Sequence, residues 1–256
     1  QYIRGLARQF SSLGWNVYAM NYRGCSGEPN RLLRAYHSGA TEDLEAVINW
    51  ISTNHAREQL HLVGFSLGGN LVLKYLGEKA EKLVGKVPAA VAVSVPVALF
   101  EAVESIQSPR NFLYNAHFLL KLRRKVREKS AVFKAAGWNP NEVLRLRKMR
   151  EFDDWYTAPV HGFENAEDYY HKASSLYVLD KIHVPTLILN ARDDSFLSPK
   201  CFPEEIARSH DHVYLETPEY GGHVGFMDQG LNGKSWAESR IIDFFGASEE
   251  IKQKKS

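Results

Sequence analysis

The segment Gly64-Phe65-Ser66-Leu67-Gly68-Gly69 constrains this chain most, because it lies where a strand pattern changes into a helix pattern. Residues 59–63 form a short apolar run of strand length, and residues 70–76 repeat apolar side chains at helical spacing. The glycines allow a tight turn that exposes the serine oxygen above a sheet, at a helix N-terminus that favours developing negative charge. The pattern predicts that Ser66 is a nucleophile; the alternative is a serine that only caps the helix.

An acid and a base follow in the chain order that serine chemistry requires. Residues 184–191 have the pattern of a buried strand that leads into two aspartates, and residues 212–217 form a strand pattern that leads into His223. A serine hydroxyl is a weak nucleophile that needs an adjacent base, and a histidine has an unperturbed pKa near ~6.5. In the α/β-hydrolase fold, the Ser, Asp and His of the triad occur in this chain order, and each lies just past the carboxyl end of a strand.

Two neighbouring carboxylates compete for the acid position. In the usual pattern of this fold, a small residue ends the strand and the acid follows three positions later. With Ala191 as that small residue, the acid is Asp194. Asp193 is then a loop carboxylate that we expect to pair with Arg192, although it stays the alternative acid.

Ten histidines compete for the position of the base. His61 lies inside a strand pattern, and most of the others lie in polar stretches typical of solvated side chains. His223 differs because Gly221 and Gly222 precede it and permit an unusual backbone path. The sequence therefore predicts His223 as the base.

Composition restricts the class of protein. A chain of 256 residues, with 24% charged and 44% hydrophobic residues, is ordinary for one large globular domain. A net charge of +2 gives no bulk attraction to nucleic acid. The two cysteines, Cys25 and Cys201, lie far apart, and the chain has no metal-ligand cluster, no P-loop and no G-x-G-x-x-G, so we expect no cofactor and no metal.

Targeting segments are not recognisable in this sequence. No apolar stretch reaches the ~18 residues that a membrane span requires. We expect a cytoplasmic protein, while the start at Gln1 leaves a preceding signal or anchor segment open.

The order of expected elements predicts an α/β fold with a mostly parallel sheet and helices on both faces. The hydrolase core is expected at residues 1–95 and 178–256, interrupted by a helical cap at residues 96–177, where no strand pattern is convincing. The expected core elements are helices at 2–12, 41–54 and 235–245 and strands at 15–20, 59–64, 89–95, 185–191 and 212–217.

The expected cap carries the only marked charge asymmetry. Residues 121–150 contain eleven Lys or Arg but only two acids, Glu128 and Glu142. We favour a solvated helix surface as the interpretation, and the alternative is a patch that contacts an anionic membrane or an acidic substrate.

Several longer motifs resemble the YheT-like branch of bacterial esterases, to which the eukaryotic membrane-associated ABHD lipases are related. They are Asn21-Tyr22-Arg23-Gly24-Cys25-Ser26-Gly27-Glu28-Pro29-Asn30-Arg31, Tyr36-His37-Ser38-Gly39, Arg150-Glu151-Phe152-Asp153-Asp154 and Tyr220-Gly221-Gly222-His223-Val224-Gly225-Phe226. The similarity extends from residue 2 to about residue 245. It implies an α/β-hydrolase that cleaves small-molecule acyl esters through an acyl-enzyme, with the triad Ser66, Asp194 and His223 and with Leu67 N–H as an oxyanion donor.

The chain departs from that branch in two places. Ser195 follows the acid where the branch usually has proline, which should alter loop stiffness more than chemistry. Members of the branch also carry a strand that ends in His-Gly before the helix that begins here near Tyr2. This strand supplies the second oxyanion donor and lies between the strands expected at 15–20 and 59–64. We therefore expect a fragment that lacks N-terminal strands, with a gap in its sheet.

Other functions are compatible with parts of the pattern. A thioesterase or an amidase would use the same three residues. The missing front strand would suit a catalytically weak binding protein with a hydrolase fold, but the complete Ser-Asp-His order favours an enzyme.

Overall fold

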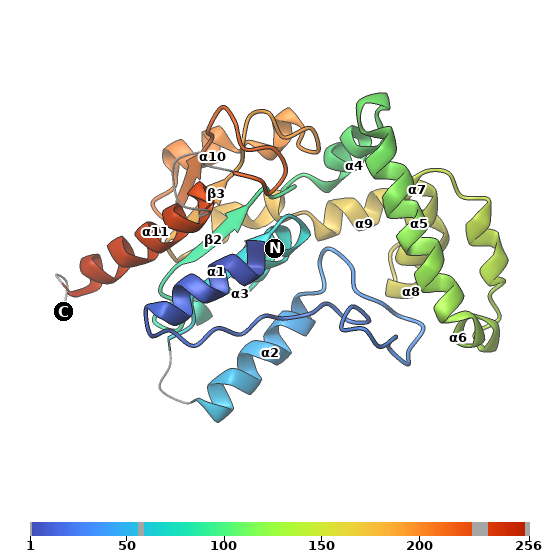
Figure 1. Ribbon diagram of the computed structural model, residues 1–256, viewed down its shortest axis with the longest axis horizontal. Coiled ribbons are helices and arrows are strands. Elements are labelled where there is room, and N and C mark those ends of the chain that lie inside the picture. The colour runs from blue at the N-terminus through green and yellow to red at the C-terminus, as the bar shows by residue number, and fades with distance from the viewer. Residues whose placement is uncertain (1, 56–58, 227–234, 254–256) are drawn as a thin grey trace.

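Four short parallel strands form the sheet of the computed structural model, which describes residues 2–55, 59–226 and 235–253 (Figure 1). The strands are β1 (Leu62–Phe65), β2 (Ala90–Val93), β3 (Thr186–Leu189) and β4 (Val213–Glu216). Within the described residues they lie in the order β1-β2-β3-β4, each paired with the next in parallel. All four carboxyl ends therefore meet at one edge, where ligands bind in open α/β sheets.

Helices cover both faces of this sheet, because successive strand side chains point to opposite sides. Ala90 and Ala92 join a core cluster on the face covered by α2 (Thr41–Asn54) and α3 (Leu67–Lys79). Val91 and Val93 join a second cluster on the opposite face. That face is covered by α1 (Tyr2–Ser12) and α11 (Trp236–Gln253), and α10 (Glu204–Ser209) packs beside β4.

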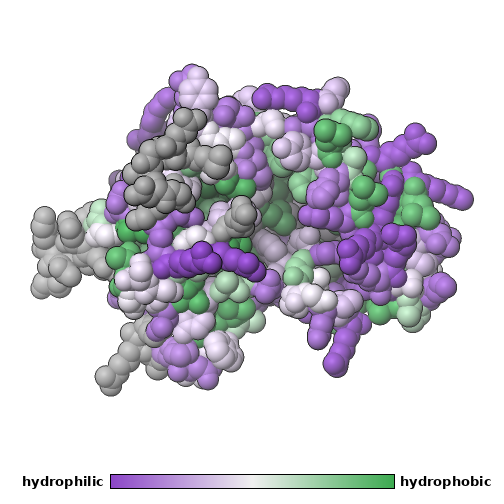
Figure 2. Space-filling view, viewed as in Figure 1, coloured by the Kyte–Doolittle hydropathy of each residue, from purple (hydrophilic) through white to green (hydrophobic). Residues whose placement is uncertain are grey.

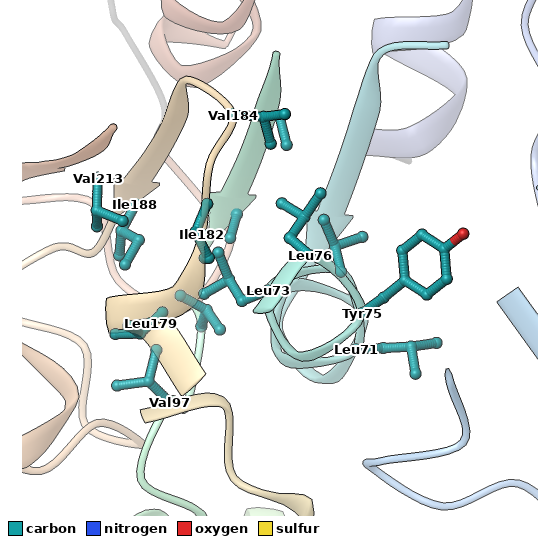
Figure 3. Close-up of a cluster of buried hydrophobic side chains, with 14 of the residues drawn as sticks. Leu71, Leu73, Tyr75, Leu76, Val97, Leu179, Ile182, Val184, Ile188 and Val213 are labelled. Carbon is teal, nitrogen blue, oxygen red and sulfur yellow. The ribbon is translucent and has the colours of Figure 1, made fainter. Parts of the chain in front are cut away.

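Helix α3 is the central helix of the core and is buried along most of its length. Leu71, Leu73, Tyr75 and Leu76 are all at most 3% exposed. Leu73 points toward Leu179 and Ile182 at η5 (Ser175–Lys181), whereas Leu71 and Tyr75 point to the other side of the helix (Figure 3). Full burial of one such side chain contributes roughly 1.5–3 kcal/mol. The core therefore fixes the position of the helix that begins directly after Ser66.

A long helical segment, residues 96–177, connects β2 to β3 and extends away from the sheet (Figure 1). Val126, Phe133, Val143, Phe152 and Tyr156 form a core cluster of its own. Its elements are α4 (Leu99–Gln107), η2 (Pro109–Asn111), α5 (Phe112–Glu128), α6 (Ser130–Ala135), η3 (Pro140–Leu144), α7 (Met149–Phe152), η4 (Asp153–Thr157), α8 (Ala158–His161) and α9 (Ala166–Ala173), followed by η5. The division into core and cap stays a prediction.

The expected helices at 2–12 and 41–54 have the predicted bounds. The strand predictions from residue 59 onward are confirmed, although each strand is shorter than its apolar run. The closing helix begins at Trp236 and continues beyond the expected end to Gln253. Gly246 does not end it, since a single glycine inside a helix costs only about 1 kcal/mol.

The strand predicted at residues 15–20 is wrong. These residues have no regular secondary structure, and Val17 and Tyr18 are 42% and 37% exposed. A strand needs a hydrogen-bonded neighbour, and the described part of the sheet ends at β1, which is an edge strand. The expected sheet gap lay between residues 15–20 and β1, and the contiguous pairing of β1 to β4 does not test it. None of the described helices has the length and apolar character needed to cross a membrane.

Candidate active site

Ser66 occupies the turn between β1 and α3, in a conformation that few residues other than glycine adopt. Its φ is 51° and its ψ is −121°. The Ser66 N–H donates to the carbonyl oxygen of Val93 at 2.8 Å, and the Ser66 carbonyl oxygen accepts from the N–H of Gly69 at 2.9 Å. Such strained residues persist only where surrounding structure holds them, and they cluster at active sites.

Two glycines make this turn sterically allowed. A Cβ atom at Gly64 would lie 2.2 Å from the carbonyl oxygen of Gly68, and a Cβ atom at Gly69 would lie 2.9 Å from Cβ of Val95. Gly64 therefore allows strand and helix to approach, and Gly69 allows α3 to pack against the chain after β2.

The loop after β4 presents His223 toward the carboxyl edge of the sheet. Gly222 has a φ of +55°, as expected for a backbone path that needs glycine. Val224 N–H donates to Ser94 Oγ at 3.0 Å, which attaches the loop to the end of β2. The loop conformation is therefore fixed on both sides of the histidine.

Asp193 holds this loop from the other side. Its Oδ1 accepts from the N–H groups of Gly221 at 2.9 Å and of Gly222 at 2.7 Å. The expected pairing of Asp193 with Arg192 is wrong, because Arg192 forms an ion pair with Glu204 instead. The two loop N–H groups attract the carboxylate, and the Arg192 side chain turns to a carboxylate on α10.

The structure brings Ser66, Asp194 and His223 into one hydrogen-bonded series. His223 Nε2 lies 2.8 Å from Ser66 Oγ, and His223 Nδ1 lies 2.8 Å from Asp194 Oδ2. The Asp194 side chain is fully buried, and its Oδ1 accepts from Phe196 N–H at 2.9 Å. With its proton on Nδ1, a neutral His223 ring donates to the Asp194 carboxylate and leaves Nε2 free to accept the proton of Ser66.

A cavity of about 610 Å³ opens beside Ser66, Leu67 and His223. Most of its wall is apolar and comes from the helical segment, for example Leu99 and Leu122. On the face drawn in Figure 2, the surface is hollowed between the sheet-bearing part and the helical segment. The volume lies within the usual range for small-molecule sites.

Leu67 is the first residue of α3 and lines this cavity with its neighbour Ser66. The first N–H groups of a helix have no carbonyl partner within the helix. The Leu67 N–H is thus available to an oxygen in the cavity, although its use as an oxyanion donor stays a prediction.

Two buried titratable groups line the cavity away from the triad. Burial raises the pKa of Asp153 to about 6, against the opposing effect of hydrogen bonds from the hydroxyls of Thr157 and Tyr170. Burial, with a smaller contribution from His161, lowers the pKa of His37 to about 4. Burial shifts both pKa values toward the neutral form, so that at pH 7 His37 is neutral while Asp153 is still mostly ionised.

Sequence reasoning missed three residues that support the site. The ring of Phe196 lies 4.4 Å from the ring of His223 between centroids. Ser94 accepts a hydrogen bond from the histidine loop, and Asn190 Oδ1 accepts from Val95 N–H at 2.7 Å. Ser94 and Asn190 directly follow β2 and β3, so their position at strand ends was the available signal.

Among the described residues, no group of three or more His, Cys, Asp or Glu could hold a metal ion.

Comparison with known proteins gives one family match. Residues 1–229 match the family described as the alpha/beta hydrolase fold. The Escherichia coli (strain K12) protein named "Putative esterase YheT" is 36% identical over 253 residues, which cover 98% of this chain and 74% of that protein. Phospholipase ABHD3 of Mus musculus is 34% identical over 230 residues, which cover 89% of this chain and 55% of that protein. The chain thus spans about three quarters of the first relative and about half of the second.

Solved structures show the same fold at lower identity. An esterase of Pyrococcus furiosus superposes with a TM-score of 0.60 at 18% identity, over 96% of this chain and 75% of that chain. A monoacylglycerol lipase of Paleococcus ferrophilus superposes with a TM-score of 0.56 at 18% identity, over 95% and 88% of the two chains.

Proposed function

Because this chain belongs to the α/β-hydrolase family, we propose that it is a serine hydrolase that cleaves carboxylic esters through an acyl-enzyme. Relatives named as an esterase, phospholipases and a monoacylglycerol lipase support ester hydrolysis as the general activity. One observation carries the finer proposal: His223 lies 2.8 Å from both Ser66 Oγ and Asp194 Oδ2.

In the proposed reaction, His223 Nε2 accepts the proton of Ser66 while Oγ attacks the ester carbonyl carbon. Leu67 N–H donates to the oxyanion that forms, at the N-terminus of α3. Collapse of this intermediate expels the alcohol, which takes the proton from His223 and leaves an acyl group on Oγ. His223 then accepts a proton from water, whose oxygen attacks the acyl carbon, and returns it to Ser66 as the acid leaves.

Asp194 acts through His223 in this scheme. The carboxylate holds the ring in the tautomer with Nδ1 protonated and stabilises the imidazolium that forms during attack. Burial of Asp194 strengthens this interaction, because an effective dielectric constant below that of water increases the attraction between the two groups.

The substrate is proposed to be a small acyl ester that enters beneath the helical segment at residues 96–177, which serves as the cap. The cavity supports this assignment, since its wall combines Ser66 and His223 with apolar side chains of α4 and α5. A thioester or an amide would follow the same steps, so both remain alternative substrates.

A second proposal is peripheral contact of α5 with an anionic membrane. Phe112, Leu113 and Tyr114, at its N-terminal end, are 66%, 78% and 54% exposed. Arg124 and Arg127 lie further along the same helix and are also exposed. Exposed apolar side chains next to basic ones are typical of helices that lie on lipid surfaces.

A fluorophosphonate probe tests the main proposal, because it reacts with an activated serine. Intact mass is measured on the wild type, on Ser66→Ala and on Ser195→Ala, each first shown to be folded by circular dichroism. We expect one adduct on the wild type and on Ser195→Ala, and none on Ser66→Ala. A folded wild type that forms no adduct would contradict the proposal and favour a hydrolase-fold binding protein.

A further inference from the structure

Helix α5 and the residue that follows it direct a row of lysines along the wall of the cavity that contains Ser66 and His223. Lys121, Lys125 and Lys129 are spaced four residues apart and all three line that cavity. Residues at this spacing share one helix face and rise about 6 Å per step. Lys121 is exposed, Lys125 is half-buried and Lys129 is 8% exposed, so the row runs from the surface into the protein.

None of these three ammonium groups has a carboxylate partner among the described residues. Lys125 Nζ donates to Cys25 Sγ at 2.7 Å and lies 4.5 Å from the centroid of the Tyr36 ring. Lys129 Nζ donates to Asn30 Oδ1 at 3.0 Å and to carbonyl oxygens of the loop at residues 32–33. All of these partners are formally neutral, so the positive charge of the row is not compensated.

The acids that line the cavity do not compensate it either. Glu128 forms an ion pair with Arg124 at 2.7 Å. Asp153 accepts hydrogen bonds from the hydroxyls of Thr157 and Tyr170, and within the described residues it forms no ion pair with a lysine of the row. Burial and then the charges of Lys125 and Arg23 lower the pKa of Lys129, which is the response expected of a cation among cations.

We propose that this lysine row binds an anionic group of the substrate, a phosphate or a carboxylate, so that the preferred substrates are acyl esters that carry such a group. The inference rests on the proposed ester hydrolysis, because the row and Ser66 share one cavity. Lys121 and Lys125 contact the anion. Lys129 has its donors engaged by the loop and contributes only its charge. Apolar wall residues such as Val103 and Leu122 contact the acyl chain.

Three esters of equal acyl length test the proposal on the full chain. They are 1-octanoylglycerol, which carries no anionic group, 1-octanoylglycerol 3-phosphate, which carries a phosphate, and 3-octanoylglycerate, which carries a carboxylate. Release of octanoate gives kcat/KM for each. We expect at least one anionic ester to exceed the neutral ester about tenfold, with a preference that declines as salt rises. The ratio between the two anionic esters identifies the favoured group.

Variants separate the row from general effects on folding. Lys125→Met should lower kcat/KM about tenfold for the anionic ester and less than twofold for the neutral ester, and Lys125→Arg should retain most of the preference. Lys134→Met is the matched control, because Lys134 is exposed on α6 and does not line the cavity. Equal kcat/KM for all three esters, or an equal loss on the neutral ester in Lys125→Met, would overturn the proposal.

A binding measurement distinguishes this proposal from the proposed function. Calorimetry on Ser66→Ala measures the affinity for 1-octanoylglycerol 3-phosphate and for 1-octanoylglycerol without turnover. Tighter binding of the phosphate ester that Lys125→Met abolishes supports the anion site even if the wild type hydrolyses none of the esters. Equal affinity for the two compounds overturns the anion site while leaving ester hydrolysis untouched.

Discussion

Asp193 and Asp194 show how neighbouring residues of one type acquire different tasks. The Asp194 side chain is buried and contacts His223 Nδ1, whereas Asp193 is exposed and its Oδ1 accepts from two backbone N–H groups. The chain turns at the end of β3, so adjacent side chains point to different partners. In the proposed mechanism Asp194 orients the ring of His223, whereas Asp193 accepts hydrogen bonds from the loop that carries this ring.

Asparagine substitutions separate these two tasks. Asp194→Asn should lower kcat for an ester substrate about 10⁴-fold, because the amide favours the wrong tautomer of His223. Asp193→Asn keeps a neutral acceptor for the loop N–H groups, so kcat should fall less than tenfold. Steady-state kinetics on both folded variants measures the difference. Equal losses in the two variants would mean that Asp193 shares the task of the acid.

The turn between β1 and α3 is the element on which the candidate site depends most. Strand and helix approach so closely that Gly64 lies directly against the backbone of Gly68. Backbone atoms cannot rotate away as side chains do, so any added carbon at Gly64 must displace the strand or the helix. The strained backbone of Ser66 would relax with them.

Gly64→Ala should therefore destabilise the protein by at least 3 kcal/mol, on the order expected for severe overpacking, or prevent folding. Gly246→Ala is the matched control, because Gly246 lies in α11 with nothing within 4 Å of an added Cβ atom. The control should stabilise α11 by about 0.5–1 kcal/mol. Urea unfolding measures both changes, and a Gly64→Ala protein as stable as the wild type would contradict the packing described for the turn.

The elements that the sequence predicts well are those set by local pattern. The strands at β1 to β4 are short apolar runs next to turn residues, and α2 has an apolar face with acids in its first turn. Residues 15–20 have a similar apolar pattern, but a strand also needs a partner, which local pattern does not encode. Likewise, the hydrogen bonds from Gly221 and Gly222 to Asp193 depend on how β3 and β4 pair, and spacing alone could not predict them.

At the scale of the whole molecule, two buried groups give opposite pH dependence of stability. The pKa of Asp153 is raised from 3.8 to about 6, so the folded state loses stability as pH rises between these values. The pKa of His37 is lowered from 6.5 to about 4, so the folded state gains stability as pH rises between these values. Each shift corresponds to about 3 kcal/mol, and the two contributions largely cancel between pH 4 and pH 6.5.

Single substitutions should reveal each contribution. From pH 4 to pH 7, the free energy of unfolding of Asp153→Asn should rise by about 3 kcal/mol relative to wild type, because the variant lacks the buried acid. Over the same pH range, the free energy of unfolding of His37→Asn should fall by a similar amount relative to wild type. Urea titrations at several pH values measure these differences. If the difference in the free energy of unfolding between a variant and the wild type does not change with pH, burial of that group does not cause the pH dependence, and the prediction is contradicted.

Membrane contact of α5 can be tested at a side chain outside the cavity, so that the cavity stays intact. Leu113 is 78% exposed and does not line the cavity. If α5 lies on an anionic surface, this side chain enters the lipid boundary while exposed arginines approach the headgroups. Replacing it with aspartate removes apolar burial and adds repulsion, so Leu113→Asp should weaken vesicle binding at least tenfold.

Sedimentation with vesicles of phosphatidylglycerol and phosphatidylcholine measures this binding. The wild type should bind at low salt and dissociate steeply as salt rises, since screening shortens the range of the charges. Val84→Asp is the control, because Val84 is 58% exposed but lies in the core part of the chain, after η1 (Ala80–Leu83). Binding that is absent, insensitive to salt or equally weakened by both substitutions would mean that the basic residues of α5 form only a solvated surface. The cavity and its lysine row would be unaffected by that outcome, because Leu113 is not among the residues that line the cavity.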